Sequence, residues 1–261
     1  CGCRGRWGLP AARPRAAPAG RGGLREPDPD EGCSARGVRR RGRAGEDHGA
    51  RFPEYCVGPG QILPGLTSAF IDGSAGTRPL INAAKVEASL LWFFYVSTYK
   101  EAYSCKSTAK DCDSAWAYYG AGQTADDPSV GFAKYVQRSD TYSHERVFDA
   151  LLAIRCWRDL DSADESEDAA LHAKALAQLD TALDHALASV LIARLERSRE
   201  TTGTEHAADW AFLQVLGPVI DRAARAIDAE KADQLLALWA RADQSTSSTL
   251  IESLSELFPC P

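Results

Sequence analysis

The chain has 261 residues, with 30 Lys and Arg against 36 Asp and Glu, 44% hydrophobic residues, 21 Gly, 13 Pro and no Met. This composition excludes a collagenous or wholly disordered chain and predicts a globular protein with one sizeable core or two small ones. No apolar stretch reaches the roughly 18 residues that span a bilayer, so we expect no transmembrane segment.

Residues 1–51 differ in composition from the rest of the chain. They contain 12 Arg, 11 Gly and 5 Pro but no Lys, and carry a net charge of +6. Such a segment buries too little apolar surface to offset the entropy of ordering it, so we expect 1–51 to be disordered and 52–261 to form a helical domain. This segment has three interpretations: an arm that binds nucleic acid or a membrane surface, a tether behind a lipid-bearing Cys1, or the product of a mis-called gene model. We favour the third.

From Arg78 onward the sequence predicts an all-α helical bundle. Helix formers dominate, and apolar residues recur three and four positions apart. The expected helices cover residues 79–103, 111–119, 131–136, a segment from an N-cap at Ser143 to Leu160, then 171–199 and 247–258. An acidic break at 161–168 separates the first half from the second.

Three short segments of the first half recur in the same order in the second half. Residues 88–91, 116–119 and 149–154 match residues 188–191, 210–213 and 233–238. Ala and Leu are common residues, so no single match is convincing. The inference depends on the three matches occurring in the same order. We expect two related multi-helix units, 78–161 and 168–258, packed into one bundle.

Five cysteines lie outside residues 1–51, and none forms a Cys-x-x-Cys pair, so neither a structural zinc site nor a redox dithiol is expected. Cys105 and Cys112 flank a polar loop between two predicted helices, where a disulfide would staple the hairpin. Cys156 could pair with Cys56 or Cys260. Because disulfides persist in oxidising compartments, we expect a secreted or periplasmic location; the alternative is free thiols in a cytosolic protein.

The aromatic segment 116–120 (Trp-Ala-Tyr-Tyr-Gly) and the helical stretches 85–102 and 145–161 resemble the algal low-iron-inducible periplasmic iron-assimilation proteins, a family of duplicated helical proteins. The resemblance covers residues 80–160 and is degraded in the second half, where no glycines follow Trp210. It implies a secreted or periplasmic protein that takes part in iron uptake and has no known catalysis. A site shared by both units would then survive in only one.

Carboxylate, phenol and imidazole side chains of the first unit suit a hard cation such as Fe(III). Five of them would form a metal site if they converged between three helices, and these candidate ligands are Glu87, Asp113, Tyr118, His144 and Glu145. Glu87 and Glu101 share one face of a mostly apolar helix, because their 14-residue separation is close to four turns. A buried carboxylate on such a face needs a cation or an ionic partner.

Each candidate ligand also has a structural interpretation. Glu87 would form a salt bridge, with Lys85, Lys100 or Arg155. At least one of Asp111 and Asp113 would cap a helix, and His144 would be a solvated residue at a helix start. In the second half His206 has the same two interpretations, and the remaining helical histidines, His172 and His185, are expected to be structural.

The aromatic residues of the first unit have two interpretations as well. They would fill the core with their polar tips outward, or line a ligand pocket between the two units. The residues are Tyr95, Tyr99, Tyr103, Tyr118, Tyr119 and the tryptophans at 92, 116 and 157.

Motifs of nucleotide-binding proteins and of common hydrolases are absent, and His144-Glu145 does not continue as His-Glu-x-x-His. Residues 52–261 carry a net charge of −12, which argues against nucleic-acid binding. We expect no enzyme but an extracytoplasmic binding protein for iron or another hard cation, with no other cofactor. The alternatives are an adaptor whose acidic surface docks a protein and, less favoured, an enzyme with Glu87 or Glu145 as a base.

Overall fold

The computed structural model describes residues 62–125, 130–160, 166–241 and 244–259, and the regular structure in these stretches is helical throughout. The prediction of an all-α protein is therefore confirmed. The α-helices are α3 (Ile62–Ser74), α4 (Pro79–Ser104), α5 (Ala109–Gly120), α6 (Gly131–Ser139), α7 (Thr141–Arg158), α8 (Ser166–Glu200), α9 (Gly203–Leu216), α10 (Asp221–Ile227), α11 (Ala229–Arg241) and α12 (Ser247–Leu257), with short 3₁₀ helices η3 (Gly217–Ile220) and η4 (Gln244–Thr246).

Several sequence-based predictions fall on other residues. The expected disordered segment 1–51, the residues Cys56 and Cys260, and part of the acidic break at 161–168 lie outside the described stretches. Inside them, no helix combines the length and the apolar character that crossing a membrane requires.

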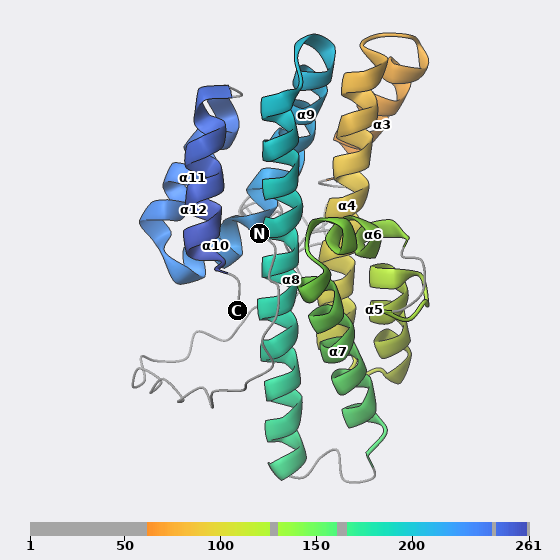
Figure 1. Cartoon of the computed structure of the whole chain (residues 1–261). Helices are drawn as coiled ribbons and strands as arrows, with labels where there is room; N and C mark the ends of the chain where they lie inside the picture. The colour runs from red at the N-terminus through yellow and green to blue at the C-terminus, as the bar shows by residue number, and fades with distance from the viewer. Residues whose placement is uncertain (1–61, 126–129, 161–165, 242–243, 260–261) are drawn as a thin grey trace, which may run out of the picture.

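The long helix α8 runs through the middle of the molecule (Figure 1). On one side of it lie α5, α6 and α7, and on the other lie α10, α11 and α12 (Figure 1). α7 and α12 pack against α8, while α4 packs against α3, α5 and α9. Because α4 belongs to the first predicted unit and α9 to the second, the two halves of the chain interlock in one bundle.

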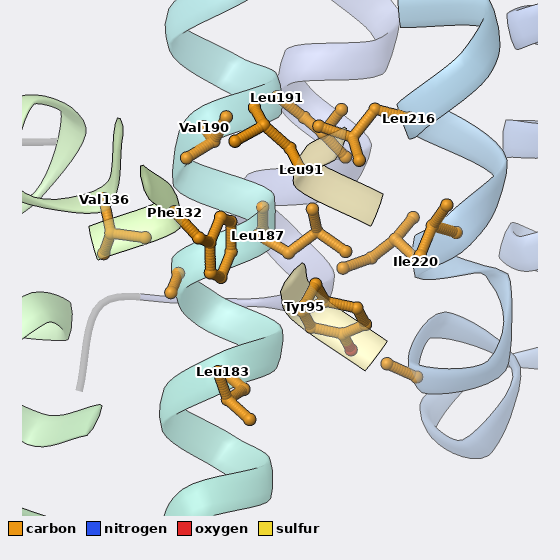
Figure 2. Close-up of a cluster of buried hydrophobic side chains, with 14 of the residues drawn as sticks. Leu91, Tyr95, Phe132, Val136, Leu183, Leu187, Val190, Leu191, Leu216 and Ile220 are labelled. Atoms are coloured by element: carbon orange, nitrogen blue, oxygen red, sulfur yellow. The ribbon is translucent and has the colours of Figure 1, made fainter. Parts of the chain in front are cut away.

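The core is built around a stripe of leucines on α8. Five of them recur every four residues and are buried: Leu179, Leu183, Leu187, Leu191 and Leu195. Residues at this spacing follow one face of a helix. Figure 2 shows side chains of α4, α6, α9 and η3 around part of this stripe, among them Leu91, Tyr95, Phe132, Val136, Leu216 and Ile220. Full burial of one leucine side chain stabilises the fold by roughly 1.5–3 kcal/mol. Because side chains from both halves of the chain pack around this stripe, the shared core joins the two halves.

Two glycines allow close contacts between helices, one in each half of the chain. A Cβ atom on Gly120, at the end of α5, would lie 2.7 Å from the ring of Phe148 on α7. A Cβ atom on Gly217, just after α9, would lie 2.5 Å from the ring of Trp239 on α11. Neither aromatic ring could keep its position beside a larger residue.

The N-cap predicted at Ser143 is wrong, because α7 begins at Thr141, three residues earlier than that cap implies. The cap is Asp140, whose carboxylate accepts hydrogen bonds from the backbone N–H groups of Tyr142 and Ser143, at 3.1 and 3.3 Å. A carboxylate here satisfies two N–H groups that have no partner within the helix and also favours the positive end of the helix dipole. Ser143 lies within the first turn and is buried.

Helix α3 was not among the helices that we expected. Its sequence contains Pro64, Gly65 and Gly73, and an interior glycine costs about 1 kcal/mol relative to alanine. Packing against α4 offsets that cost. The helix leaves apolar side chains exposed, with Phe70 at 65% and Ile71 at 59% of their full accessibility.

The predicted disulfide is confirmed. Cys105, directly after α4, is bonded to Cys112 in α5, with the Cα atoms 4.8 Å apart. The bond closes the turn between these two helices. Cys156 is an exposed free thiol; Cys56 and Cys260, with which it could pair, lie outside the described stretches.

Candidate functional site

Glu87, the first predicted metal ligand, takes part in an ion pair. Its Oε2 lies 3.0 Å from Nη2 of Arg194 on α8, and its Oε1 accepts a 2.7 Å hydrogen bond from the hydroxyl of Tyr135 on α6. The salt-bridge alternative for Glu87 therefore fits the structure. Its partner, however, comes from the second half of the chain rather than from Lys85, Lys100 or Arg155.

Arg194 also contacts a second, fully buried carboxylate. Its Nε lies 2.8 Å from Oδ1 of Asp209 on α9, an ion pair by distance although the N–H is not aligned as a hydrogen bond. Oδ2 of Asp209 accepts from the Thr201 hydroxyl at 3.0 Å, and the guanidinium of Arg194 lies 4.1 Å from the ring centre of Phe212. We call Glu87, Tyr135, Arg194 and Asp209 the Arg194 network. Every carboxylate in it has a cationic partner.

The other predicted ligands lie in separate surroundings. Asp113 forms an exposed ion pair with Arg155 at 3.0 Å, Tyr118 packs edge-on against the ring of Phe93, and Glu145 is exposed on α7. In the four described stretches, no group of three or more His, Cys, Asp or Glu side chains is placed to hold a metal ion. The structure thus does not gather the predicted set around one centre.

His144 is a core residue rather than a solvated one. It is 1% exposed, with Nδ1 3.3 Å from the hydroxyl of Tyr119 and Nε2 3.4 Å from the carbonyl oxygen of Ala125. Burial lowers the pKa of its imidazole. If Nε2 carries the proton, it donates to the carbonyl while Nδ1 accepts from the phenol, so a neutral ring satisfies both contacts.

Asp140, Ser143 and His185 bring together the residue types of a catalytic triad, but not its geometry. The Ser143 hydroxyl donates to Oδ2 of Asp140 at 2.6 Å and lies 2.6 Å from Nδ1 of His185. Oδ2 of Asp140 lies 3.5 Å from that same Nδ1. In a triad the serine and the carboxylate face opposite ring nitrogens, so that the imidazole can take the serine proton.

This group acts instead as a buried extension of the α7 cap. Burial acts to raise the pKa of Asp140, but hydrogen bonds from His185, Ser143 and the backbone outweigh it and hold the pKa at about 2. A cavity of about 30 Å³ beside His185 has room for a single water molecule.

A different group of side chains lies between α4, α8 and α10, and we call it the tyrosine–aspartate cluster. Its members are Tyr95, Tyr99, Tyr103, Asp180, Asp184 and Arg222. The tyrosines stand at four-residue intervals on α4 and the two aspartates stand one turn apart on α8. Residues at such spacing share one helix face, so two faces rich in oxygen atoms meet.

Hydrogen bonds link the phenols of α4 to the carboxylates of α8. The Tyr95 hydroxyl donates to Oδ1 of Asp184 at 2.9 Å, and the Tyr103 hydroxyl donates to Oδ2 of Asp180 at 2.6 Å. The rings of Tyr99 and Tyr103 are stacked, with their centres 4.5 Å apart. This stacking fixes the rings of Tyr99 and Tyr103, so the Tyr103 hydroxyl is held beside Asp180.

Burial controls the protonation of this cluster. It raises the pKa of Asp184 to about 6, although the Tyr95 hydroxyl and the charge of Arg222 act to lower it. Burial also raises the pKa of Asp180, against the hydrogen bond from Tyr103. The phenol pKa values of Tyr95 and Tyr103 rise as well, through burial first and then through the neighbouring carboxylates. Burial of the two carboxylates thus outweighs the opposing effects of the phenol hydroxyls and of Arg222.

One carboxylate oxygen of the cluster has no hydrogen-bond partner. Oδ1 of Asp180 is buried and unpaired, while Oδ2 is held by Tyr103. A buried polar atom without a partner costs free energy. Each of the two carboxylates accepts a hydrogen bond from one phenol, and carboxylate and phenol oxygens are the donors that hard cations prefer.

Sequence analysis identified the tyrosines of this cluster but missed Asp180, Asp184 and Arg222. A usable signal was present, because the two aspartates interrupt an Ala- and Leu-rich helix with a four-residue spacing that matches the tyrosines. What the sequence could not show is that α4 and α8 face each other at this register. Tyr103 and Asp180 are 77 residues apart.

The role of the cluster has to be argued from its geometry. The resemblance to iron-assimilation proteins is neither confirmed nor refuted by comparison with known proteins. No family model matches the chain, and neither the curated proteins nor the solved structures contain a significant match.

Proposed function

We propose that this protein is an extracytoplasmic helical binding protein whose cargo is a hard, multivalent cation such as Fe(III), bound at the tyrosine–aspartate cluster. The observation that carries the proposal is the buried, unpartnered Oδ1 of Asp180, one helical turn from the second carboxylate at Asp184. Glu87 is not part of the site, because Arg194 and Tyr135 already occupy its carboxylate.

The donor set suits such a cargo. Asp180 and Asp184 would supply charged carboxylate oxygens, while Tyr95 and Tyr103, which now donate to them, would supply phenol oxygens. Since ligand groups bind metals in their deprotonated forms, uptake of the cation would release protons from the phenols and from Asp184. Binding would therefore strengthen as the pH rises through about 6, the pKa of Asp184.

The location is supported by the disulfide. Cys105 and Cys112 close a turn at the end of α4, the helix that carries all three tyrosines of the cluster. Disulfides persist in oxidising compartments, which favours a secreted or periplasmic protein.

The test is Fe(III) binding by the full chain, followed by elemental analysis and by the visible absorption that iron–phenolate bonds produce. Asp180→Asn combined with Asp184→Asn should abolish binding, and Tyr103→Phe should weaken the absorption. Asp113→Asn and Glu145→Gln serve as matched controls, because they remove exposed carboxylates. Iron retained by the double variant but lost from the controls would favour the ligands first predicted from the sequence. A folded protein with no bound iron would exclude the proposal.

We further infer that the bundle arose from two related units. Burial supports the alignment at the paired positions Ala88 and Ala188, Leu91 and Leu191, Tyr119 and Leu213, and Leu151 and Leu235, all of which are buried. Superposition of α4 and α5 on α8 and α9 should bring these pairs into alignment; a best superposition in another register would refute the duplication.

A second candidate function is that of a protein-interaction module. The exposed apolar side chains of α3, Leu63, Phe70 and Ile71, favour it. Substituting Phe70 and Ile71 with Ser should then abolish co-purification of a partner while Fe(III) binding is unchanged. If the partner is retained by this variant, α3 is not the interface.

A further inference from the structure

The buried side chain of His185 has one ring nitrogen without a partner, and it lines a small cavity. The side chain is only 8% exposed, and its Nδ1 faces Ser143 and Asp140. Its Nε2 has no hydrogen-bond partner among the residues that the structure describes. Because Nδ1 is occupied at the other edge of the ring, Nε2 is the polar atom that His185 presents to the cavity of about 30 Å³.

The hydrogen bonds of Ser143 decide which nitrogen of His185 carries a proton. The Ser143 hydroxyl has a single proton, which it donates to Oδ2 of Asp140 at 2.6 Å. The 2.6 Å contact between the Ser143 oxygen and Nδ1 of His185 must then be donated by the N–H group of the ring. In the neutral ring the lone pair is consequently on Nε2, so His185 offers the cavity a hydrogen-bond acceptor.

The other polar side chains along the cavity also offer acceptors. The hydroxyl protons of Ser139 and Ser189 are donated to the backbone carbonyls of Tyr135 and His185, both at 2.9 Å, so their oxygens are left to accept. Glu196, about three turns further along α8 than His185, carries a carboxylate that can only accept. The apolar part of the described lining consists of Ala188, Ile192, Ala193 and Phe258.

We propose that the cavity beside His185 binds a small ammonium-type cation, either NH₄⁺ or the terminal ammonium group of a primary amine. NH₄⁺ is about as large as the single water molecule for which the cavity has room. All its N–H groups donate, and it has no lone pair that needs a donor. A water molecule would leave its own lone pairs unpaired among these acceptors, which costs free energy in a buried place.

Charge and ligand chemistry favour an ammonium group over a metal ion. Asp140, with a pKa of about 2, is ionised, and its Oδ2 lies 3.5 Å from Nδ1 of His185, where it favours a cation across the ring. Hard metal ions prefer oxygen ligands to an imidazole nitrogen. Transition-metal ions accept imidazole but are held by several ligands, and no group of three His, Cys, Asp or Glu side chains is placed for this in the described part of the chain.

The test is nitrogen NMR of the labelled full chain at about pH 8, where a free imidazole is neutral. The His185 ring, assigned by the loss of its signals in His185→Gln, should carry its proton on Nδ1. NH₄Cl should shift the Nε2 resonance saturably, whereas KCl should not, because K⁺ has a similar size but no N–H donor. A proton on Nε2 would overturn the proposal, since the ring would then present a donor to the cavity.

Two further variants locate the bound cation. Ser139→Ala and Ser189→Ala each remove one acceptor and should weaken NH₄⁺ binding about tenfold, as expected for a lost hydrogen bond to a charged group. Thr181→Ala is the matched control, because its hydroxyl also donates to a carbonyl one turn earlier on α8 but is exposed. Binding that is unchanged in both serine variants would place the cation elsewhere and overturn the proposal.

Methylammonium chloride separates the two sources of the ammonium group. A saturable shift with methylammonium would identify a primary amine as the ligand, and a response to NH₄⁺ alone would identify the free ion. Equal shifts with KCl and NH₄Cl would overturn the proposal, because the site would then respond to charge and size alone. No shift with any of the three salts would overturn it as well and leave the cavity to a water molecule. These salt comparisons use the unsubstituted protein, and their outcome does not depend on Fe(III) binding at the tyrosine–aspartate cluster.

Discussion

Two groups of charged side chains lie along α8, and they differ in how their carboxylates are paired. In the Arg194 network, Arg194 lies between Glu87 and Asp209, with a cationic nitrogen within 3.0 Å of each carboxylate. In the tyrosine–aspartate cluster, the aspartates are paired mainly with neutral phenols, and Oδ1 of Asp180 has no partner. The same helix thus supplies the cation of one group and the anions of the other.

The difference separates carboxylates that have a cationic partner from carboxylates held mainly by neutral donors. A buried ion pair with matched charges fixes the packing of neighbouring helices, although its net contribution to stability is small. Carboxylates held by neutral donors keep an electrostatic cost, which shows as the raised pKa of Asp184. Shifted pKa values occur both at functional sites and in structural networks, so the cluster needs the direct binding test described above. This contrast is what directs attention to Asp180 and Asp184 rather than to Glu87.

The largest expected loss in the free energy of unfolding is that of Asp209→Ala in the Arg194 network. Removing this fully buried carboxylate leaves Arg194, itself 11% exposed, without its closest anion. Breaking a buried pair in this way costs about 3–5 kcal/mol. Chemical denaturation at neutral pH would measure the loss in the free energy of unfolding. A loss below about 1 kcal/mol, the range of exposed pairs, would show that the network is not a structural centre of the bundle.

A smaller change in the free energy of unfolding, this time an increase, is expected for Asp184→Asn at neutral pH. The folded-state pKa of Asp184, about 6, lies above the ordinary value of 3.8. Protonated Asp184 therefore stabilises the fold below about pH 4, and this contribution is lost as the pH rises through 6. At pH 7 the variant lacks the cost of the buried charge and should be more stable, on the order of 2 kcal/mol.

The pH dependence of unfolding separates Asp184 from Asp140. Between pH 4 and 7 the free energy of unfolding of the unsubstituted protein should fall relative to that of Asp184→Asn. Asp140, whose pKa is lowered to about 2, contributes stability above pH 4 that is lost only as the pH falls toward 2. Parallel pH profiles for the two proteins between pH 4 and 7 would contradict the raised pKa of Asp184.

The sequence was sufficient to predict the all-α class and the approximate positions of α4, α5, α6, α7, α8 and α12, because local patterns decide them. The apolar middle of α4 predicts a buried helix, and the polar loop between Cys105 and Cys112 predicts the disulfide. The failures also have local causes. Helix α3 contains glycines that lower its intrinsic helicity, and the cap of α7 depends on which of two nearby polar residues, Asp140 or Ser143, turns toward the free N–H groups.

The candidate site was less accessible from the sequence, because it depends on which helix faces meet. The partner of Glu87 is 107 residues away, and the partner of Tyr103 is 77 residues away. Residue types alone made Glu87 and Asp180 equally suitable as ligands. Only the register of α8 against α4 decides that Arg194 reaches Glu87 and that the phenol of Tyr103 reaches Asp180.

The smallest effect is expected for Asp113→Asn, which tests a third kind of carboxylate. Asp113 and Arg155 lie 3.0 Å apart, but their side chains are 65% and 47% exposed. Water and salt screen such a pair, and its loss typically costs about 0–1 kcal/mol. Thermal unfolding at low and at high ionic strength would measure it, and any loss should shrink in high salt. A loss of stability as large as that of Asp209→Ala, and unaffected by salt, would contradict this expectation. It would mean that the contribution of an ion pair to the stability of this protein does not depend on its burial.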